Sequence, residues 1–503
     1  MVYRQQHFAP KMLLAIITVL VIESSTAQTT GTTYQEDQRP QIHFSPQKGW
    51  MNDPNGMVFY KGTYHLFFQH YPDTTVWGPM HWGHATSKDL IHWQEQPIAL
   101  FPDSLGYIFS GSAVLDADNT SGFGSKGQPP LVAIFTHHDP KGEGKRNNYQ
   151  NQSIAYSLDE GKTWTKYEGN PVLKNPGIPD FRDPKVCWFE KDKKWIMTLA
   201  TKDRITFYSS KDLKSWTKES EFGEGIGAHG GVWECPDLFP LTYRGKKMWV
   251  LIVNINPGAP FGGSGTQYFV GNFDGHTFIP VDTDTKWMDY GRDNYAGITW
   301  SNTGNRKIFL GWMSNWQYAE KVPTFPWRSA MTIPRELALE KAADKFIVTS
   351  QPVKELLAIA GTPVPFVPAN KKSAFTAPGT LTISFTKIMN FSITLSNDLD
   401  EKIVIGYDMI SNQYYIDRQR SGKSSFSEGF SGRCIVPRLS DKNVLDVTMV
   451  IDKASVEFFA DGGLCVFTNI FFPHRPYSQV EWQIAEPAAI KSITFTPLKS
   501  IWE

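Results

Sequence analysis

The segment SKDLIHW (Ser87–Trp93) decides the fold because related segments recur along the chain. They are SLDEGKTW (Ser157–Trp164), SKDLKSW (Ser210–Trp216) and, less closely, NFDGHTF (Asn272–Phe278). Each is typical of a strand end, a polar turn with Asp or Gly, and an aromatic residue that enters the next strand. One such turn would be an ordinary hairpin, but four at broadly similar spacing indicate repeated antiparallel modules.

Short apolar strands rich in Val, Ile, Phe, Tyr and Trp interleave with these turns, and helical periodicity over long stretches is absent. The chain divides into five modules, each of which opens with a polar segment. Repeated antiparallel sheets predict a five-bladed β-propeller, whose innermost strands converge on one axis. Residues far apart in sequence would then meet at one mouth of the central funnel; these are Asp53, Ser110, Asp183, Glu234 and Tyr295.

The module pattern ends near Arg335–Leu337, and alternating strands separated by Gly- and Asp-rich turns follow. That pattern predicts a β-sandwich. The expected fold class is therefore all-β, with a propeller over residues 40–350, a linker over 351–370 and a sandwich over 371–503. No catalytic residue is expected in the sandwich.

The N-terminus has the pattern of a secretory signal peptide over residues 1–27, followed by a linker over 28–39. Arg4 and Lys11 precede a short apolar run, and small residues stand at the expected cleavage site. The alternative is a disordered amphipathic tail. No later run reaches the ~18 apolar residues of a membrane helix. We therefore expect a secreted or periplasmic protein without a membrane anchor once the signal is removed.

Composition excludes some functions and leaves others open. Lys+Arg and Asp+Glu each number 50, and this balance argues against a nucleic-acid partner, which needs a basic surface. The segment His137–Asp139 and the pair His81/His84 suggest a metal, but no ligand set completes the spacing, so no metal or cofactor is expected. Cys187 and Cys235 are interpreted as buried small residues, and a disulfide between Cys434 and Cys465 stays open.

Three segments carry one acid each among turn-forming and aromatic residues. Asp53 lies in WMNDPNG (Trp50–Gly56), Asp183 in FRDP (Phe181–Pro184) and Glu234 in WECPD (Trp233–Asp237). A glycosidic bond is cleaved by two carboxylates, with aromatic rings to stack on the sugar. Each acid alone would be an ordinary turn or cap residue. Together they indicate a site that cleaves glycosides.

These segments resemble, in order and spacing, the three acid motifs of the β-fructofuranosidases of glycoside hydrolase family 32, which includes invertases, inulinases and levanases. FSGS (Phe109–Ser112) and GWMSNWQY (Gly311–Tyr318) also match, and the resemblance runs from about Pro40 to the C-terminus. It implies the same propeller and sandwich. It also implies hydrolysis with retention, which needs no metal.

By this resemblance Asp53 is the nucleophile, Glu234 the general acid and base, and Asp183 a transition-state stabiliser that binds fructose hydroxyls. We expect Arg182 to keep Asp183 ionised, and a dry pocket beside Trp233 to keep Glu234 protonated. The residues that match positions lining the fructose pocket are Asn52, Gln69, Trp77, Phe109, Ser110, Arg182, Asp293 and Trp316. Trp316 would stack on the sugar, and Trp77 would exclude water. Asp237 is expected to be structural.

The stretches Trp316–Tyr318, Pro323–Arg328 and Gln152–Ser157 resemble the exo-inulinase and levanase branch more than the plant invertases. The resemblance therefore implies an exo-acting enzyme that releases terminal fructose from fructan polysaccharide, fructo-oligosaccharides and sucrose. A sucrose-specific invertase, an endo-levanase and a fructosyltransferase remain alternatives, since the same acids would serve them. A binding module with a dead site would lack Asp53 or Glu234. An inverting, arabinan-cleaving propeller enzyme would lack the Trp50–Gly56 segment.

Overall fold

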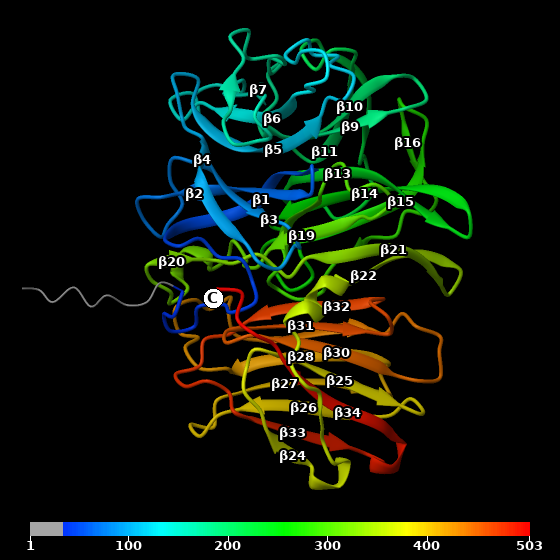
Figure 1. Cartoon of the computed structure of the whole chain (residues 1–503). Helices are drawn as coiled ribbons and strands as arrows, with labels where there is room; N and C mark the ends of the chain where they lie inside the picture. Colours follow the sequence, from blue (N-terminus) through cyan, green and yellow to red (C-terminus); the bar gives the residue numbers. More distant parts are fainter. Residues whose placement is uncertain (1–33, 503) are drawn as a thin grey trace, which may run out of the picture.

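The computed structural model describes residues 34–502, and strands make up most of its regular structure (Figure 1). The predicted signal segment lies outside the described residues, as does the N-terminal linker up to residue 33. Across residues 34–502, no helix has the length and apolar character required to cross a membrane.

Five sheets follow one another along the chain between Gly49 and Pro352. The first contains β1 (Gly49–Tyr60), β2 (Thr63–Tyr71), β3 (His81–Ser87) and β4 (Gln94–Leu100), with β20 (Trp327–Arg328) parallel to β1; the second contains β5 (Tyr107–Leu115), β6 (Leu131–His138), β7 (Gln150–Ser157) and β8 (Thr165–Lys166). The third contains β9 (Phe181–Phe189), β10 (Lys194–Thr201), β11 (Arg204–Ser210) and β12 (Thr217–Phe222). The fourth contains β13 (Val232–Tyr243), β14 (Lys246–Asn256), β15 (Gly265–Phe273), β16 (Phe278–Pro280) and β17 (Lys286–Trp287); the fifth contains β18 (Tyr295–Thr299), β19 (Ile308–Trp312), β21 (Arg335–Ala342) and β22 (Lys345–Pro352).

The first strands of these sheets form a closed ring. β1 contacts β5, β5 contacts β9, β9 contacts β13, β13 contacts β18, and β18 returns to β1. A ring of antiparallel sheets around one axis is a β-propeller, so the predicted architecture of this half is confirmed. Its five sheets occupy the positions expected for the five predicted modules.

The repeated turn segments occupy equivalent places in four of these sheets, between the third and the outer strand. In the first sheet Asp89 Oδ1 accepts hydrogen bonds from the amides of Ile91 (3.0 Å) and His92 (2.9 Å). In the third, Asp212 Oδ1 does the same for Lys214 (2.9 Å) and Ser215 (2.8 Å). The carboxylate thus replaces backbone partners inside a tight turn, and this local chemistry explains why the segment recurs.

The C-terminal half is a sandwich of two six-stranded sheets, as predicted. One sheet has the order β23 (Val364–Pro365), β34 (Ile490–Pro497), β25 (Gly379–Phe385), β30 (Asp446–Ile451), β31 (Ser455–Ala460), β32 (Cys465–Ile470). The other has the order β24 (Lys372–Ala374), β33 (Gln479–Ile484), β26 (Phe391–Ser396), β27 (Lys402–Asp408), β28 (Gln413–Arg420), β29 (Arg433–Pro437). Alternating buried positions on both inner faces form one apolar core.

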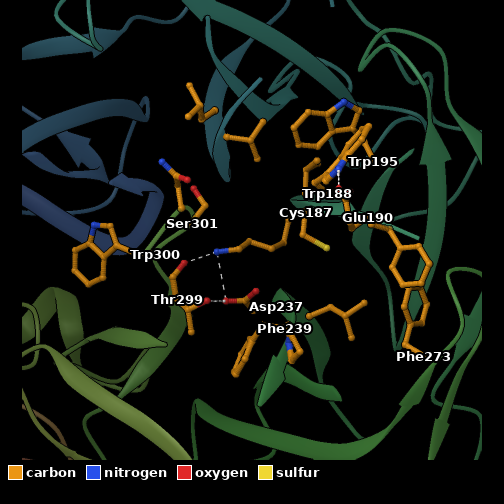
Figure 2. A pocket seen from close by; sticks show the side chains of 18 of the residues that line it. Cys187, Trp188, Glu190, Trp195, Asp237, Phe239, Phe273, Thr299, Trp300 and Ser301 are labelled. Carbon is orange, nitrogen blue, oxygen red and sulfur yellow. Dashed lines mark hydrogen bonds and ion pairs between the residues drawn. The ribbon is translucent and has the colours of Figure 1, made fainter. Parts of the chain in front are cut away.

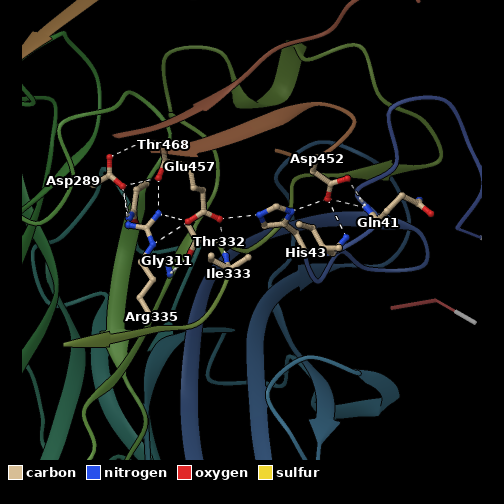
Figure 3. A network of polar contacts seen from close by, with 12 residues as sticks. Gln41, His43, Asp289, Gly311, Thr332, Ile333, Arg335, Asp452, Glu457 and Thr468 are labelled. Atoms are coloured by element: carbon tan, nitrogen blue, oxygen red, sulfur yellow. Dashed lines mark hydrogen bonds and ion pairs between the residues drawn. The ribbon is translucent and has the colours of Figure 1, made fainter. Parts of the chain in front are cut away.

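The propeller and the sandwich meet across a buried network of charges (Figure 3). Arg335 of β21 lies against Asp289 and against Glu457 of β31. His43, from the segment before β1, bridges Glu457 and Asp452 at 2.8 Å on each ring nitrogen. The sandwich is therefore joined to the propeller by paired charges as well as by apolar packing.

The four cysteines are all free thiols, so Cys434 and Cys465 form no disulfide. Cys235 is buried as expected. Cys187 is partly exposed, which corrects its interpretation as a buried residue. The reason is that Cys187 lines an open cavity at one end of the propeller axis.

Candidate active site

A pocket of about 200 Å³ brings the three predicted acids together. Its lining residues are Asn52, Asp53, Gln69, Trp77, Phe109, Ser110, His138, Glu143, Tyr149, Gln150, Asp180, Arg182, Asp183, Glu234 and Trp316. Asp53 lies on β1, Asp183 on β9 and Glu234 on β13, so three sheets each contribute one carboxylate. Every predicted site residue except Asp293 lines this pocket.

Irregular strand pairing explains how the inner strands present these side chains. The register of all five innermost strands shifts near the pocket, between Met51 and Pro54 in β1 and between Glu234 and Asp237 in β13, for example. A β-bulge bends its strand and re-aims side chains, and bulges are common beside active sites. Asp183 has a positive φ of 63°, an uncommon conformation for a residue with a side chain. The local backbone thus departs from regular β-structure where the acids are placed.

Asp53 is held by hydrogen-bond donors on both carboxylate oxygens. The Ser110 hydroxyl donates to Oδ2 at 2.7 Å, and the Asn52 amide donates to Oδ1 at 2.9 Å. The Cys235 thiol lies 3.5 Å from Oδ2. Burial, with the charge of Glu234 adding to it, raises the pKa of Asp53 in spite of these donors.

Asp183 is 5% exposed and accepts a hydrogen bond from the backbone amide of Cys235 at 3.0 Å. Burial raises its pKa to about 7, and the charges of Glu234 and Asp53 add to that effect. Arg182 opposes the rise, but its Nε is 4.0 Å from Asp183 Oδ2. Arg182 thus favours the ionised form of Asp183, as expected, but burial and the two neighbouring acids outweigh it.

Arg182 is hydrogen-bonded to Glu234. Its Nη2 donates to Glu234 Oε1 at 2.9 Å, while Nη1 donates to Asp180 at 2.5 Å. The Tyr295 hydroxyl donates to the other oxygen, Oε2. Both carboxylate oxygens of Glu234 thus have a fixed partner.

Trp233 does not dry the pocket, contrary to expectation. It is fully buried and packs among Phe222, His229 and Phe269 within the core of the third and fourth sheets. Side chains alternate along a strand, so the neighbour of a pocket residue faces away from the pocket. The aromatic walls come from other elements.

Trp77, Phe109 and Trp316 provide those walls. Trp316 packs against Trp50 and Trp312, with ring centroids 5.8 Å and 5.0 Å away, and Trp77 meets Phe109 edge to face at 6.1 Å. Nε2 of Gln69 is buried and has no hydrogen-bond partner within the described residues. It is a donor in the pocket wall that a ligand hydroxyl can use.

Asp293 lies elsewhere, so the expectation that it lines the pocket is not met. It is fully buried, and its carboxylate accepts hydrogen bonds from Tyr318 (2.5 Å), Arg418 (2.6 Å) and the amide of Ile470 (3.0 Å). These partners couple the propeller to the sandwich. Asp237 is structural, as expected: it accepts from the amide and the hydroxyl of Thr299 and pairs with Lys185.

Residues that the sequence did not indicate complete one side of the pocket: His138, Glu143, Tyr149, Gln150 and Asp180. His138 ends β6 and Gln150 begins β7, Glu143 and Tyr149 lie in the Lys- and Gly-rich segment between them, and Asp180 precedes β9. Only the pairing of β6 with β7 could have placed them here. Within residues 34–502, no group of three or more His, Cys, Asp or Glu side chains is arranged to hold a metal ion.

Known proteins match this chain over almost its whole length. The model of the glycosyl hydrolases family 32 N-terminal domain matches residues 43–351, and that of the family's C-terminal domain matches residues 344–497. A levanase of Bacillus subtilis is 46% identical over 514 residues, covering 98% of this chain and 75% of the relative. An extracellular exo-inulinase of Aspergillus awamori is 42% identical over 492 residues, covering 88% and 91%.

Solved structures agree with this match. The crystal structure of the Aspergillus awamori exo-inulinase superposes with a TM-score of 0.85 at 38% identity, over 93% of this chain and 100% of that one. Both domains match one family. The chain belongs to glycosyl hydrolase family 32 and is a glycosidase.

Proposed function

We propose that this glycosidase is a secreted, exo-acting β-fructosidase that releases terminal fructose from fructans and sucrose with retention. The relatives named levanase and exo-inulinase support a fructan substrate. The observation that carries the proposal is the convergence of Asp53, Asp183 and Glu234 in one small pocket. Secretion rests on the signal-like pattern of residues 1–27, and the Aspergillus awamori relative is named extracellular.

In this mechanism Asp53 attacks the anomeric carbon of the fructosyl ring while Glu234 protonates the departing oxygen. Water then hydrolyses the fructosyl-enzyme, with Glu234 acting as the base. Arg182 and Tyr295 hold the Glu234 carboxyl in one orientation from either side. Ser110 and Asn52 likewise orient Asp53, so both reacting groups are positioned before substrate arrives.

Asp183 has a different role because its environment differs. With a pKa raised to about 7 by burial and by the two neighbouring acids, it is largely neutral in mildly acidic solution. A neutral carboxyl can donate one hydrogen bond and accept another from fructose hydroxyls. It also spares Asp53 a third nearby negative charge, which favours the ionised nucleophile.

The size of the pocket supports exo rather than endo action. Its volume of about 200 Å³ is below the ~300–1,000 Å³ of pockets that hold drug-sized ligands. Trp77 and Trp316 border it, and such walls suit one terminal sugar rather than the middle of a polymer.

The test is a product profile for levan, inulin and sucrose, measured separately and compared with an Asp53→Ala control. Fructose as the sole product from either polymer is the expected result. A ladder of oligosaccharides would mean endo cleavage, and activity on sucrose alone would mean an invertase. Trisaccharides at high sucrose would indicate transfer, and no product from any substrate would refute the proposed function.

A further inference from the structure

Two inner strands of the propeller, β9 and β13, form a pair of opposite charges at each end. Arg182 and Glu234 form the pair at the catalytic pocket, and Lys185 and Asp237 form the other, in the wall of a second cavity of about 760 Å³ (Figure 2). In the cavity, Lys185 Nζ lies 3.3 Å from Asp237 Oδ2, and within the described residues it has no second acid as a partner. At the pocket, the cation does have a second acid.

This second acid is Asp180, which also lines the pocket. Its Oδ1 accepts a hydrogen bond from Arg182 Nη1 at 2.5 Å, while Arg182 Nη2 donates to Glu234 Oε1 at 2.9 Å. The Arg182 side chain is only 12% exposed, so water screens these contacts weakly. Among the described residues, Asp180 and Glu234 are the acids hydrogen-bonded to this guanidinium, since Asp183 lies 4.0 Å away.

The backbone ties Asp180 to the strand that carries Glu234. The Asp180 carbonyl accepts a hydrogen bond from the Lys202 amide at 2.9 Å, and the Lys202 carbonyl accepts one from the Trp233 amide at 2.7 Å. Lys202 lies in the turn between β10 and β11, and Trp233 is the neighbour of Glu234. Both acids beside Arg182 are therefore fixed through one turn, by contacts that do not involve the Asp180 side chain.

A cation that is hydrogen-bonded to a general acid works against it, because the cation favours the ionised form. A general acid must hold its proton until the departing oxygen takes it. Burial alone would lower the pKa of Arg182, but the charges of Glu234, Asp183 and Asp180 raise it well above its usual range, so the guanidinium stays charged. The Asp180 carboxylate offsets part of that charge while it holds the guanidinium in place.

The neighbouring titratable groups within the described residues do not take this role. Burial raises the pKa values of Tyr295 and Cys235 well above their usual range, so both stay neutral. Burial lowers the pKa of His138 and raises that of Tyr149, so neither carries a charge near pH 7. Glu143 is exposed and lies 3.3 Å from His138 Nε2. The titratable neighbours of Glu234 that remain are the acids of the pocket itself, Asp53 and Asp183.

We propose that Asp180 is a positioning residue for the general acid and acts through Arg182: it fixes the guanidinium and offsets its charge, so that Glu234 keeps its proton until the leaving group departs. This role rests on the proposed function, in which Glu234 is the acid. It assigns Asp180 to proton donation rather than to contact with the sugar. A role in the fold alone would not change the shape of the pH profile.

The pH dependence of kcat/KM for sucrose, measured with the whole protein, tests the proposal. Asp180→Asn removes the charge but keeps an oxygen for Arg182, and asparagine tolerates the positive φ of 56° at this position. Without the offsetting charge Glu234 loses its proton more readily, so we expect the alkaline limb of the profile to move to lower pH by about 1. An unchanged alkaline limb overturns the proposal even if the rate falls, because a contact with the sugar would lower the rate at every pH alike.

A substrate whose leaving group needs no proton separates an effect on Glu234 from one on Asp183. p-Nitrophenyl β-D-fructofuranoside releases a stable phenolate, whereas the sugar that leaves sucrose must take a proton. We expect the alkaline limb to move further with sucrose than with the aryl substrate. We also expect Asp180→Gly, which loses the hydrogen bond as well, to lower kcat/KM about tenfold more for sucrose. Equal effects on both substrates would place the effect on Asp183 and overturn the proposal.

Asp203→Asn is the matched control. Asp203 also lies beside an arginine, with its Oδ1 3.4 Å from Arg204 Nε in the same turn as Lys202, but it does not line the pocket. It should leave the pH profile unchanged, and a displacement as large as that of Asp180→Asn would contradict a specific role for Asp180. No hydrolysis of sucrose by the native chain would refute the proposed function itself, whereas an active native chain with an unmoved limb in Asp180→Asn refutes only the role of Asp180.

Discussion

The pocket that contains Asp53, Asp183 and Glu234 and the interface between propeller and sandwich both bury acids, but they differ in the cations placed beside those acids. At the interface Arg335 and His43 provide cations for Asp289, Glu457 and Asp452 (Figure 3). In the pocket, Arg182 is hydrogen-bonded to Glu234 and Asp180, whereas Asp183 lies 4.0 Å from its Nε and Asp53 has no cation partner within the described residues. Burial is common to both regions, so the difference lies in how many hydrogen-bonded cations each acid has.

The pKa values follow that difference. Burial alone would raise the pKa of Asp452 and Glu457, but bonds from His43, and Arg335 beside Glu457, lower both. In the pocket burial prevails and the pKa values of Asp53 and Asp183 rise. The interface acids, each paired with a buried cation, join the two domains. Asp53 and Asp183, which have no hydrogen-bonded cation, remain available to a substrate, at a cost to stability.

The largest expected effect is on activity. Glu234→Ala should lower kcat by at least ~10³-fold, since it removes both the proton donor and the base, while the unfolding temperature changes little. Steady-state kinetics on sucrose and a thermal melt check this. Recovery of turnover by azide, with a β-configured fructosyl azide as product, would support the acid and base role. Native-like turnover without azide would exclude it.

A substitution at the interface between propeller and sandwich should lower stability rather than activity. Arg335→Met leaves Asp289 buried without an ion pair and Glu457 with His43 as its remaining cation, and we expect the free energy of unfolding to fall by about 3–5 kcal/mol. Arg306→Met is the control, because Arg306 also contacts two acids but at the partly exposed surface, where ~1 kcal/mol or less is expected. Denaturant unfolding measures both. Equal losses would contradict the contrast drawn between buried and surface pairs.

Asp183→Asn should stabilise the protein as it inactivates it. A raised pKa means that stability is fully present below the unfolded value near 4 and is lost as pH rises through about 7. Asparagine carries no charge, so the variant escapes this loss. We expect its unfolding temperature relative to the native chain to increase by a few °C between pH 5 and pH 8. A pH-independent difference would argue against an elevated pKa at Asp183.

The smallest effect concerns His43. Burial alone would lower its pKa, but hydrogen bonds to Asp452 and Glu457 raise it to about 9. Its contribution to stability is therefore complete below about pH 6.5 and is lost as pH rises through about 9. The gap in unfolding temperature between the native chain and His43→Gln should be wide at pH 6 and narrow at pH 10. A gap that widens with pH would contradict a raised pKa at His43.

Much of the fold could be predicted because its signals are local. The Ser87–Trp93 turn and its relatives form through contacts between residues a few positions apart. Similar residues therefore form the same turn in different sheets. Strands with period-two patterns then follow between the turns. Asp53, Asp183 and Glu234 could be proposed as pocket residues for a similar reason, since each stands in a short, distinctive segment, and they do line one pocket.

The predictions that failed concern properties that no single segment of the sequence determines. Asp293 was expected in the pocket, but its carboxylate is used by Arg418, a residue 125 positions later in the chain. Arg182 adjoins Asp183 in sequence and lies 4.0 Å from it, yet its hydrogen bonds go to Asp180 and to Glu234, 52 positions later. Sequence adjacency is therefore a poor guide to which charges pair.

By itself, the sequence determined the all-β architecture and the order of its domains, because turn chemistry and strand periodicity act over a few residues, and it indicated the three acids that share one pocket. Only the tertiary structure decided how readily each acid ionises, which polar groups are left without partners, and where the two cavities open. Those properties depend on burial and on charges brought together from distant strands, and burial exists only once the ring of sheets has closed.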